Sequence, residues 1–361
     1  MKIGILTYHR AHNYGAMLQT YATRTFLQSK GYGDVRIMDY EPEDNKYYYA
    51  IFDRRRFLAL DILRKIKFLI CKNPLWMLRK QRRRKAFIEF YETYLTPFWN
   101  KDEQLDVLIY GSDQIWNIDD EKELKELDTC YFGDDTFHAY RKIAYSASMG
   151  IIKPTLMLDD IVRTYMLNFQ AISVREVALR DYIQCVIPGI DIHVTVDPVF
   201  LLSKEQWEQL VPEEELTEKY ILVYNLRGES AVDQLAHRMQ SKTGYALKYL
   251  TFDVSTWPKK EYLDLADPRT FLWLIKNAEC VVASSFHGIA FSIIFHTPFY
   301  ASLPNHALRI KSLLNMAGLE ERWFENLNQL NESPIDWMKV DENMAKAIKL
   351  SKEYLMGEFE K

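Results

Sequence analysis

The sequence predicts an α/β protein of two doubly wound domains that face each other across a cleft, with a basic helical insertion in the first domain. Short apolar strands alternate with polar or glycine-rich turns and helical patterns along most of the chain. A polar, acidic interval at residues 200–219 separates two such series. The 361 residues, 48% of them hydrophobic, exceed the length at which a single core stops growing, roughly 250–300 residues.

The strands of both series are apolar and rich in β-branched residues, as expected for strands buried on both faces of a parallel sheet. In the first series they are expected at residues 2–8, 35–39, 107–110, 142–146, 171–174 and 193–196. In the second they are expected at residues 220–224, 246–250, 280–283 and 298–301, with a helix at 268–277 that Asp267 can cap. We therefore expect a first domain at 1–200, a second at 201–335, and a C-terminal helix within 336–361 that packs back on the first domain.

Residues 46–100 interrupt the first series between its second and third strands. Within them, residues 54–85 hold thirteen Lys or Arg and one acid, Asp61, a local charge of +12 in a chain of net charge −4. Apolar residues alternate with these cations in a helical pattern that is typical of an element at a membrane surface. Solvated helices packed on the domain explain the pattern equally well. Nucleic acid is not expected, because no reader motif is present and the rest of the chain is acidic.

The sequence predicts a cytoplasmic location and no metal or dinucleotide cofactor. The apolar stretch at residues 1–8 is too short for a signal peptide. The four cysteines are dispersed without a Cys-x-x-Cys or Cys/His cluster, and Gly-x-Gly-x-x-Gly is absent. Residues 280–308 carry no Asp, Glu, Lys or Arg, but Ser, His, Gly and Pro interrupt them, so no membrane span is expected there.

The most informative string is residues 283–292, which follows an expected strand. It presents Ser285, His287 and Gly288 at a strand-to-helix turn, where backbone N–H groups at the positive end of a helix favour an anion. A lone His is most often structural, but this position at the expected cleft favours a catalytic role for His287. With Arg309 downstream and no acid from 280 to 319, this half of the cleft favours a small, highly charged anion.

The first domain presents two further candidates for binding an anion in the cleft. Asn13 and Gly15 leave the first strand and begin a helix, which places them at a helix N-terminus on the cleft side. Arg175 stands at the end of the strand expected at 171–174. It is either an anion clamp or a salt-bridged structural arginine.

A polar turn with a flat aromatic side chain follows the third strand. It contains Ser112, Asp113, Gln114 and Trp116. This composition suits the face of a sugar, and the alternative is an Asx-capped helix over a core tryptophan.

Taken in this order, these strings resemble the polysaccharide pyruvyl transferase family. The resemblance covers residues 1 to about 320 apart from the insertion, and is carried by residues 13–16, 18–19, 111–117, 173–176, 197–198, 285–288 and 309–314. Members have two Rossmann-like domains arranged as in GT-B glycosyltransferases. They transfer the enolpyruvyl group of phosphoenolpyruvate onto two hydroxyls of a sugar, which gives a cyclic pyruvate ketal and phosphate.

The resemblance implies a ketal-forming transferase with phosphoenolpyruvate as donor and no cofactor. It implies that His287, or a group that it orients, protonates the methylene carbon of the donor. The implied phosphoenolpyruvate-binding residues are Asn13, Gly15, Arg175, Ser285, Gly288 and Arg309, and the implied acceptor-binding residues are Ser112, Asp113, Gln114 and Trp116. Many members carry Arg two residues before the motif His. Ser285 stands there in this chain, so Arg309 is expected to balance the phosphate.

The resemblance also implies a glycan acceptor used in polysaccharide synthesis, such as exopolysaccharide or capsule. Such acceptors are often built on a polyprenyl carrier at the cytoplasmic face of the plasma membrane, to which residues 54–85 would attach the enzyme peripherally through anionic lipid. Two other functions stay open. A GT-B glycosyltransferase that uses a nucleotide sugar is disfavoured by the lack of a carboxylate for the ribose in this part of the second domain. A non-catalytic glycan-binding protein is disfavoured by the His and Arg set.

Overall fold

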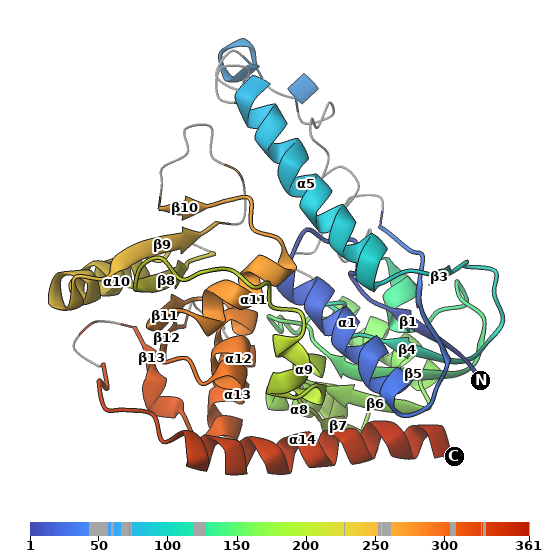
Figure 1. The fold of residues 1–361 in the computed structure, drawn as a ribbon. Coiled ribbons are helices and arrows are strands. Elements are labelled where there is room, and N and C mark those ends of the chain that lie inside the picture. Colours follow the sequence, from blue (N-terminus) through green and yellow to red (C-terminus); the bar gives the residue numbers. More distant parts are fainter. Residues whose placement is uncertain are drawn as a thin grey trace.

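The computed structural model describes residues 1–42, 57–58, 61–65, 72, 74–117, 128–226, 228–251, 254, 261–303, 308–325, 327 and 330–360. Within them the chain forms two parallel sheets, each flanked by helices (Figure 1). Relative to the chain order, the second sheet has the strand order 3-2-1-4-5-6 that is characteristic of a Rossmann-like domain, and the first sheet has the same order with a seventh strand at its edge. The α/β class with two doubly wound domains, predicted from the sequence, is thereby confirmed.

In the described part of the chain the first sheet has seven strands, in the order β3-β2-β1-β4-β5-β6-β7. They are β1 (Lys2–Leu6), β2 (Asp34–Met38), β3 (Phe98–Trp99), β4 (Leu105–Tyr110), β5 (Ala139–Ala147), β6 (Ala171–Val174) and β7 (Ile192–Val194). Six of them were predicted from the sequence, within a few residues at their ends. β3 corrects the prediction that residues 46–100 form a helical insertion, because Phe98 and Trp99 pair with β2 at the edge of the sheet.

The second sheet has six strands among the described residues, in the order β10-β9-β8-β11-β12-β13. They are β8 (Tyr220–Tyr224), β9 (Ala246–Leu250), β10 (Tyr262–Leu263), β11 (Cys280–Ala283), β12 (Phe299–Ser302) and β13 (Trp323–Phe324). The central four match the predicted strands. The two edge strands were not predicted, because two residues are too few to show a strand pattern.

Several of the helices that follow these strands begin at side chains that cap them. They are α1 (Tyr14–Ser29), α5 (Pro74–Tyr94), α7 (Leu156–Tyr165), α8 (Val177–Val186), α9 (Lys204–Glu208), α10 (Ser230–Thr243), α11 (Pro268–Lys276), α12 (Phe286–Phe295), α13 (Leu308–Ala317) and α14 (Trp337–Glu360), with 3₁₀ turns at Thr129–Phe132, Met166–Asn168, Pro198–Leu201 and Glu320–Arg322. Asn13 Oδ1 accepts hydrogen bonds from the first turn of α1, and Asp267 and Ser285 do the same for α11 and α12. Such caps satisfy N–H groups that the helix itself leaves unpaired.

The two domains share one apolar core. The ring of Tyr14, at the start of α1, stacks on Phe271 of α11 with centroids 4.9 Å apart. Trp207 of α9 meets Phe291 of α12 edge to face at 5.0 Å and lies 5.8 Å from the ring of Tyr21 of α1. Because Tyr14, Phe271 and Trp207 are almost fully buried, this packing holds α1 against the second domain.

The C-terminal helix α14 runs beneath both domains (Figure 1). Near its start, Asp341 lies 2.8 Å from His296 of the second domain. Further along, Ser351 Oγ accepts a hydrogen bond from the backbone N–H of Val196, and Glu358 pairs with Arg141 at 3.3 Å. The helix therefore contacts the second domain as well as the first, on which the sequence predicted it to pack.

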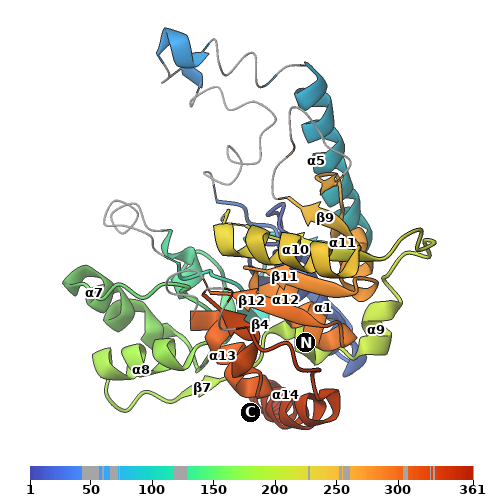
Figure 2. The same cartoon turned by 90° about the vertical axis from the view of Figure 1, so that its left-hand side faces the viewer.

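Helix α5 is the described part of the basic insertion that reaches the second domain. It projects away from the body of the protein at its N-terminal end (Figure 1, Figure 2), and it contacts residues that flank the edge strand β10 of the second sheet. Trp76 Nε1 donates to the carbonyl of Val254, Arg79 pairs with the carboxylate of Asp264, and Arg83 donates to the Asp264 carbonyl at 2.8 Å. Two cations predicted to belong to a free surface thus bind the second domain instead. Residues 46–56, 59–60, 66–71 and 73 of the insertion lie outside the described residues.

In the described part of the chain, no helix combines the length and the apolar character needed to cross a bilayer. Cys130, Cys185 and Cys280 are free thiols, and Cys71 lies outside the described residues.

Candidate active site between the two domains

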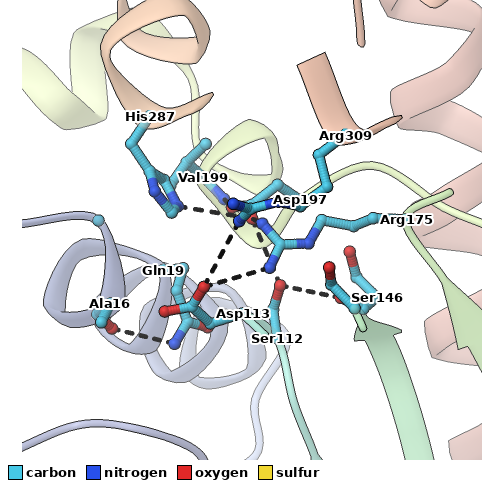
Figure 3. Close-up of polar contacts among 12 residues, drawn as sticks. Ala16, Gln19, Ser112, Asp113, Ser146, Arg175, Asp197, Val199, His287 and Arg309 are labelled. Carbon is cyan, nitrogen blue, oxygen red and sulfur yellow. Dashed lines mark hydrogen bonds and ion pairs between the residues drawn. The ribbon is translucent and has the colours of Figure 1, made fainter. Parts of the chain in front are cut away.

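A cluster of charged side chains lies where the carboxyl ends of the two sheets meet (Figure 3). Asp113, Arg175 and Asp197 follow strands of the first sheet, whereas His287 and Arg309 come from α12 and α13 of the second domain. In open α/β sheets, the crevice at this end of the strands is the usual position of a ligand site. The structure therefore brings together five residues separated by up to 196 positions in the sequence.

His287 occupies the first turn of α12, directly against the first turn of α1. Ser285 caps α12, and its Oγ accepts a hydrogen bond from Gly288 N–H at 3.4 Å. The imidazole lies so close to Gly15 that a Cβ at that glycine would stand 1.9 Å from Nδ1. Asn13 holds the turn that carries Gly15, because its Oδ1 accepts from Gly15 N–H at 2.9 Å. Two helix N-termini therefore meet at one imidazole, which is 7% exposed as a residue.

Asp197 joins the two domains at the centre of the cluster. Its Oδ2 lies 2.5 Å from Arg175 Nη1 and 3.6 Å from His287 Nε2, and its Oδ1 accepts from Val199 N–H at 3.0 Å. Burial opposes ionisation of this carboxyl, but the charge of Arg175 and the interaction with His287 outweigh it and lower the pKa of Asp197 to about 2. Asp197 is therefore a buried carboxylate at neutral pH.

Arg175 is a salt-bridged arginine in this arrangement. Its side chain is only 2% exposed, binds Asp197, and has a second carboxylate, Asp113 Oδ1, at 3.5 Å. Its guanidinium also lies 5.0 Å from the ring centre of Phe286. Of the two alternatives that the sequence left open, the structure favours the structural one.

Arg309 is held less firmly than Arg175. Its side chain is 21% exposed, and its contact with Asp113 Oδ1 is long, at 3.8 Å. Burial and then the nearby charge of Arg175 lower the pKa of Arg309 to about 10, so it stays a cation at neutral pH. The second domain has no acid from 280 to 319, but the first domain supplies two, so the charges of the two arginines and two aspartates formally cancel.

The turn predicted to contact the acceptor is largely buried. Trp116 is 0% exposed, donates from Nε1 to the carbonyl of Tyr131 at 2.9 Å and stacks on Phe132. Trp116 is therefore a core residue without a free face for a sugar, which corrects its predicted role. Ser112 is also 0% exposed, with Oγ 3.0 Å from the Ser146 carbonyl and 3.3 Å from Asp197 Oδ2, so it supports the charged cluster rather than an open surface.

The other two residues of that turn differ from each other in position. Asp113 belongs to the charged cluster, as its contacts with both arginines show. Gln114 lies apart from it and packs against Gly150, where a Cβ would stand 2.2 Å from the Gln114 amide nitrogen. Of the four predicted acceptor residues, Ser112 and Asp113 contact the cluster, and Gln114 and Trp116 do not.

Sequence reasoning missed Asp197 and Glu176 as site residues. Both are acids shortly after strands of the first sheet, and the Asp197-Pro198 pair is the sequence signal that could have identified one of them. Glu176 is 2% exposed, its Oε1 accepts from Ser148 Oγ, and its Oε2 has no hydrogen-bond partner among the described residues. Burial raises the pKa of Glu176. Carboxylates at strand ends should therefore have been candidates as well.

Two spaces of very different volume adjoin the cluster. Between Arg175, Asp197, Phe286 and Arg309 it amounts to about 10 Å³, barely enough for one water molecule. A much larger hollow, of about 580 Å³, adjoins it between α8 and α13. Among the described residues, no group of three or more His, Cys, Asp or Glu side chains is arranged to hold a metal ion.

Comparison with known proteins gives a family match and distant structural similarity. A sequence model of the family described as polysaccharide pyruvyl transferase matches residues 13–306. No curated protein matches the chain. Similar solved structures include UDP-GlcNAc 2-epimerase from Neisseria meningitidis bound to UDP-GlcNAc, which is 10% identical, with 98% of this chain and 93% of that chain covered and a TM-score of 0.45. The glycosyltransferase SnogD from Streptomyces nogalater is 10% identical, with 99% of each chain covered and a TM-score of 0.41.

Proposed function

Because the chain belongs to the polysaccharide pyruvyl transferase family, we propose that it transfers the enolpyruvyl group of phosphoenolpyruvate onto two hydroxyls of a sugar. The products are a pyruvate ketal and phosphate. The observation that supports this most is His287, a buried imidazole beside Asp197 and two arginines, at the point where the N-termini of α1 and α12 meet. This set combines a proton donor with groups that stabilise a phosphate and a carboxylate.

The reaction requires one proton to be delivered to carbon and one phosphate to leave. In the proposed sequence, His287 or a group that it orients protonates the methylene carbon, which becomes a methyl group, while a sugar hydroxyl bonds to the enol carbon and loses its proton. The bond from that carbon to the phosphate oxygen then breaks, with its electron pair on phosphate. The second hydroxyl bonds to the same carbon and loses its proton, which closes the ketal.

Arg309 is the cation best suited to the phosphate. It is partly exposed and its only close carboxylate among the described residues is 3.8 Å away, whereas Arg175 is held at 2.5 Å by Asp197. The helix N-terminus at Ser285 and Gly288 adds favourable electrostatics for an anion beside it. The small space between Arg175, Asp197 and Arg309, about 10 Å³, is too small to hold phosphoenolpyruvate, so we propose that the donor binds on the exposed side of Arg309.

The test is a melting scan of the purified protein with phosphoenolpyruvate, nucleoside diphosphates and nucleotide sugars, added one at a time. A ligand that binds the folded state raises its stability. We expect phosphoenolpyruvate to raise the melting temperature, and the rise to be lost in His287→Ala and Arg309→Ala. Stabilisation by a nucleotide, with no response to phosphoenolpyruvate, would instead indicate a glycosyltransferase.

We further propose that the glycan acceptor is lipid-linked and that the enzyme works in the cytoplasm, attached to anionic lipid through residues 54–85. The described part of this segment combines exposed apolar side chains at Leu75 and Leu78 with exposed cations at Arg82, Arg84 and Lys85 on α5. That combination suits an anionic membrane surface.

Vesicle sedimentation at low salt tests the membrane attachment. We expect the protein to sediment with vesicles that contain phosphatidylglycerol, and more weakly with pure phosphatidylcholine. Charge reversal of Arg82 and Arg84 to Glu should release it, whereas reversal of the exposed Lys349 on α14 should not. If the wild-type protein fails to bind the anionic vesicles, residues 54–85 are solvated helices instead.

A further inference from the structure

A hollow of about 580 Å³ is lined by residues of α8 in the first domain and of α13 in the second. Figure 2 labels both helices. Its volume falls within the range of roughly 300–1,000 Å³ that small-molecule sites occupy. The residues predicted to bind the acceptor do not line it, and Trp116 and Ser112 are fully buried elsewhere. The hollow is therefore a candidate site distinct from the one inferred from the sequence.

The hollow adjoins the charged cluster directly. Ser312 and Met316 of α13 line the hollow, and they also line the small space that Arg175, Asp197 and Arg309 enclose. Ser312 Oγ also donates to the backbone carbonyl of Arg175 at 3.1 Å, so α13 contacts the first domain at this boundary. A molecule in the hollow would thus lie next to a donor bound at Arg309.

Among the described residues that line the hollow, Glu176 has a buried side-chain oxygen with no hydrogen-bond partner. It is 2% exposed, and its Oε2 has no hydrogen-bond partner among the described residues. A buried carboxylate oxygen without a partner is costly, and a hydroxyl group that donates to it removes that cost. A sugar carries several hydroxyl groups that can donate such a hydrogen bond.

The rest of the lining fits an uncharged sugar better than an anion. Asp181 and Asn315 add acceptors and donors, and among the described residues of the lining Lys311 is the one cation, against two acids. Apolar side chains, Met316 among them, can pack against the C–H face of a sugar ring. A phosphate or carboxylate would meet the two acids instead, so this hollow is unsuited to phosphoenolpyruvate.

We propose that the hollow between α8 and α13 binds the acceptor sugar, with one of its hydroxyls donating to Glu176 beside the charged cluster. This inference rests on the proposed pyruvyl transfer and adds the position of the acceptor. It assigns binding to residues of both domains, Glu176 and Asp181 from the first and Ser312 and Asn315 from the second.

The experiment is saturation-transfer NMR of the full chain with methyl glycosides of glucose, galactose, mannose, N-acetylglucosamine and N-acetylmannosamine, each with and without phosphoenolpyruvate. Val177→Trp places a large ring at an exposed position of the lining, where it fills the hollow without entering the core. Cys185→Trp is the matched control, since it adds the same ring to the same helix at an exposed position outside the lining. The melting shift with phosphoenolpyruvate is recorded for every variant.

We expect at least one glycoside to receive saturation from the wild type and from Cys185→Trp, and none from Val177→Trp, while phosphoenolpyruvate still stabilises all three. An unchanged signal in Val177→Trp would overturn the assignment, and so would the absence of any signal from the wild type. The proposed donor is tested separately: if phosphoenolpyruvate stabilises no variant, pyruvyl transfer itself fails, whatever the glycosides do.

Discussion

Substitution of Gly15 by Ala tests the contact between the two helix N-termini. The added methyl group would stand 1.9 Å from His287 Nδ1 and 2.2 Å from its Cγ, whereas an ordinary contact is 3.4 Å or more. The imidazole must therefore move by about 1.5 Å, the difference between these distances. Because α12 is buried along its whole length, the ring cannot move without disturbing the packing between the domains.

The expected effects on stability and on ligand binding can be separated. Overpacking costs about 1–3 kcal/mol, offset by up to about 1 kcal/mol because Ala favours a helix over Gly. Loss of one charge-assisted hydrogen bond between His287 and the bound donor costs about 1.5–3 kcal/mol, which weakens binding of phosphoenolpyruvate roughly 10- to 150-fold. At a ligand concentration of about 100 times the wild-type Kd, the stabilisation then falls from about 2.7 kcal/mol to between about 0.3 and 1.4 kcal/mol.

The assay is urea unfolding of the wild type and Gly15→Ala with and without phosphoenolpyruvate. Gly33→Ala is the matched control, because Gly33 is exposed and has no atom within 4 Å of the added methyl group. It should behave like the wild type in both conditions. If Gly15→Ala keeps the full stabilisation by phosphoenolpyruvate, His287 does not contact the donor and the proposed active site is wrong.

Three further predictions concern the insertion, a buried histidine and the donor site. Arg79→Ala should lower the free energy of unfolding by about 3 kcal/mol, because it removes the salt bridge between Arg79 and the buried carboxylate of Asp264. The control, Arg82→Ala, changes an exposed residue of the same helix and should alter the free energy of unfolding by less than about 0.5 kcal/mol. Equal effects of the two variants in urea unfolding would contradict the contact between α5 and the second domain. Burial lowers the pKa of His9 to about 4 in the folded protein, from the ordinary value of 6.5. As the pH falls, the imidazole is therefore protonated in the unfolded chain before it is protonated in the folded one. About 3 kcal/mol of folding stability should be present above pH 6.5 and should be lost as the pH falls toward 4. His9→Asn should flatten unfolding free energy against pH in that window, and an unchanged slope would show that other groups cause it. Arg309→Lys should weaken phosphoenolpyruvate binding about 10-fold with little loss of stability, and a melting shift equal to that of the wild type would remove Arg309 from the donor site.

The sequence by itself determined the secondary structure of the central strands and the starts of the helices. These features depend on residues close together in the chain. A strand such as β8 appears as a short apolar run, and Asn13 and Ser285 cap helices whose N–H groups lie within three residues of them. The family strings follow the same strand ends, so the position of the cleft could be predicted as well.

Only the tertiary structure decided which of the predicted site residues interact. Arg175 could have been an anion clamp until Asp197, 22 positions away, was found at 2.5 Å. Trp116 could have faced a sugar until the fold placed Phe132 against it. Arg79, counted with a membrane surface, pairs with Asp264 across 185 positions.

The physical reason is that such pairings are not properties of any local pattern. An arginine has the same propensities whether a carboxylate from another strand lies beside it or not, and packing alone brings the two together. Edge strands of two residues, such as β3, likewise exist only because a neighbouring strand offers hydrogen bonds. The chain thus specified where positive charge stands along the sequence, and the fold decided which cations aspartates hold closely and which one, Arg309, stays partly exposed.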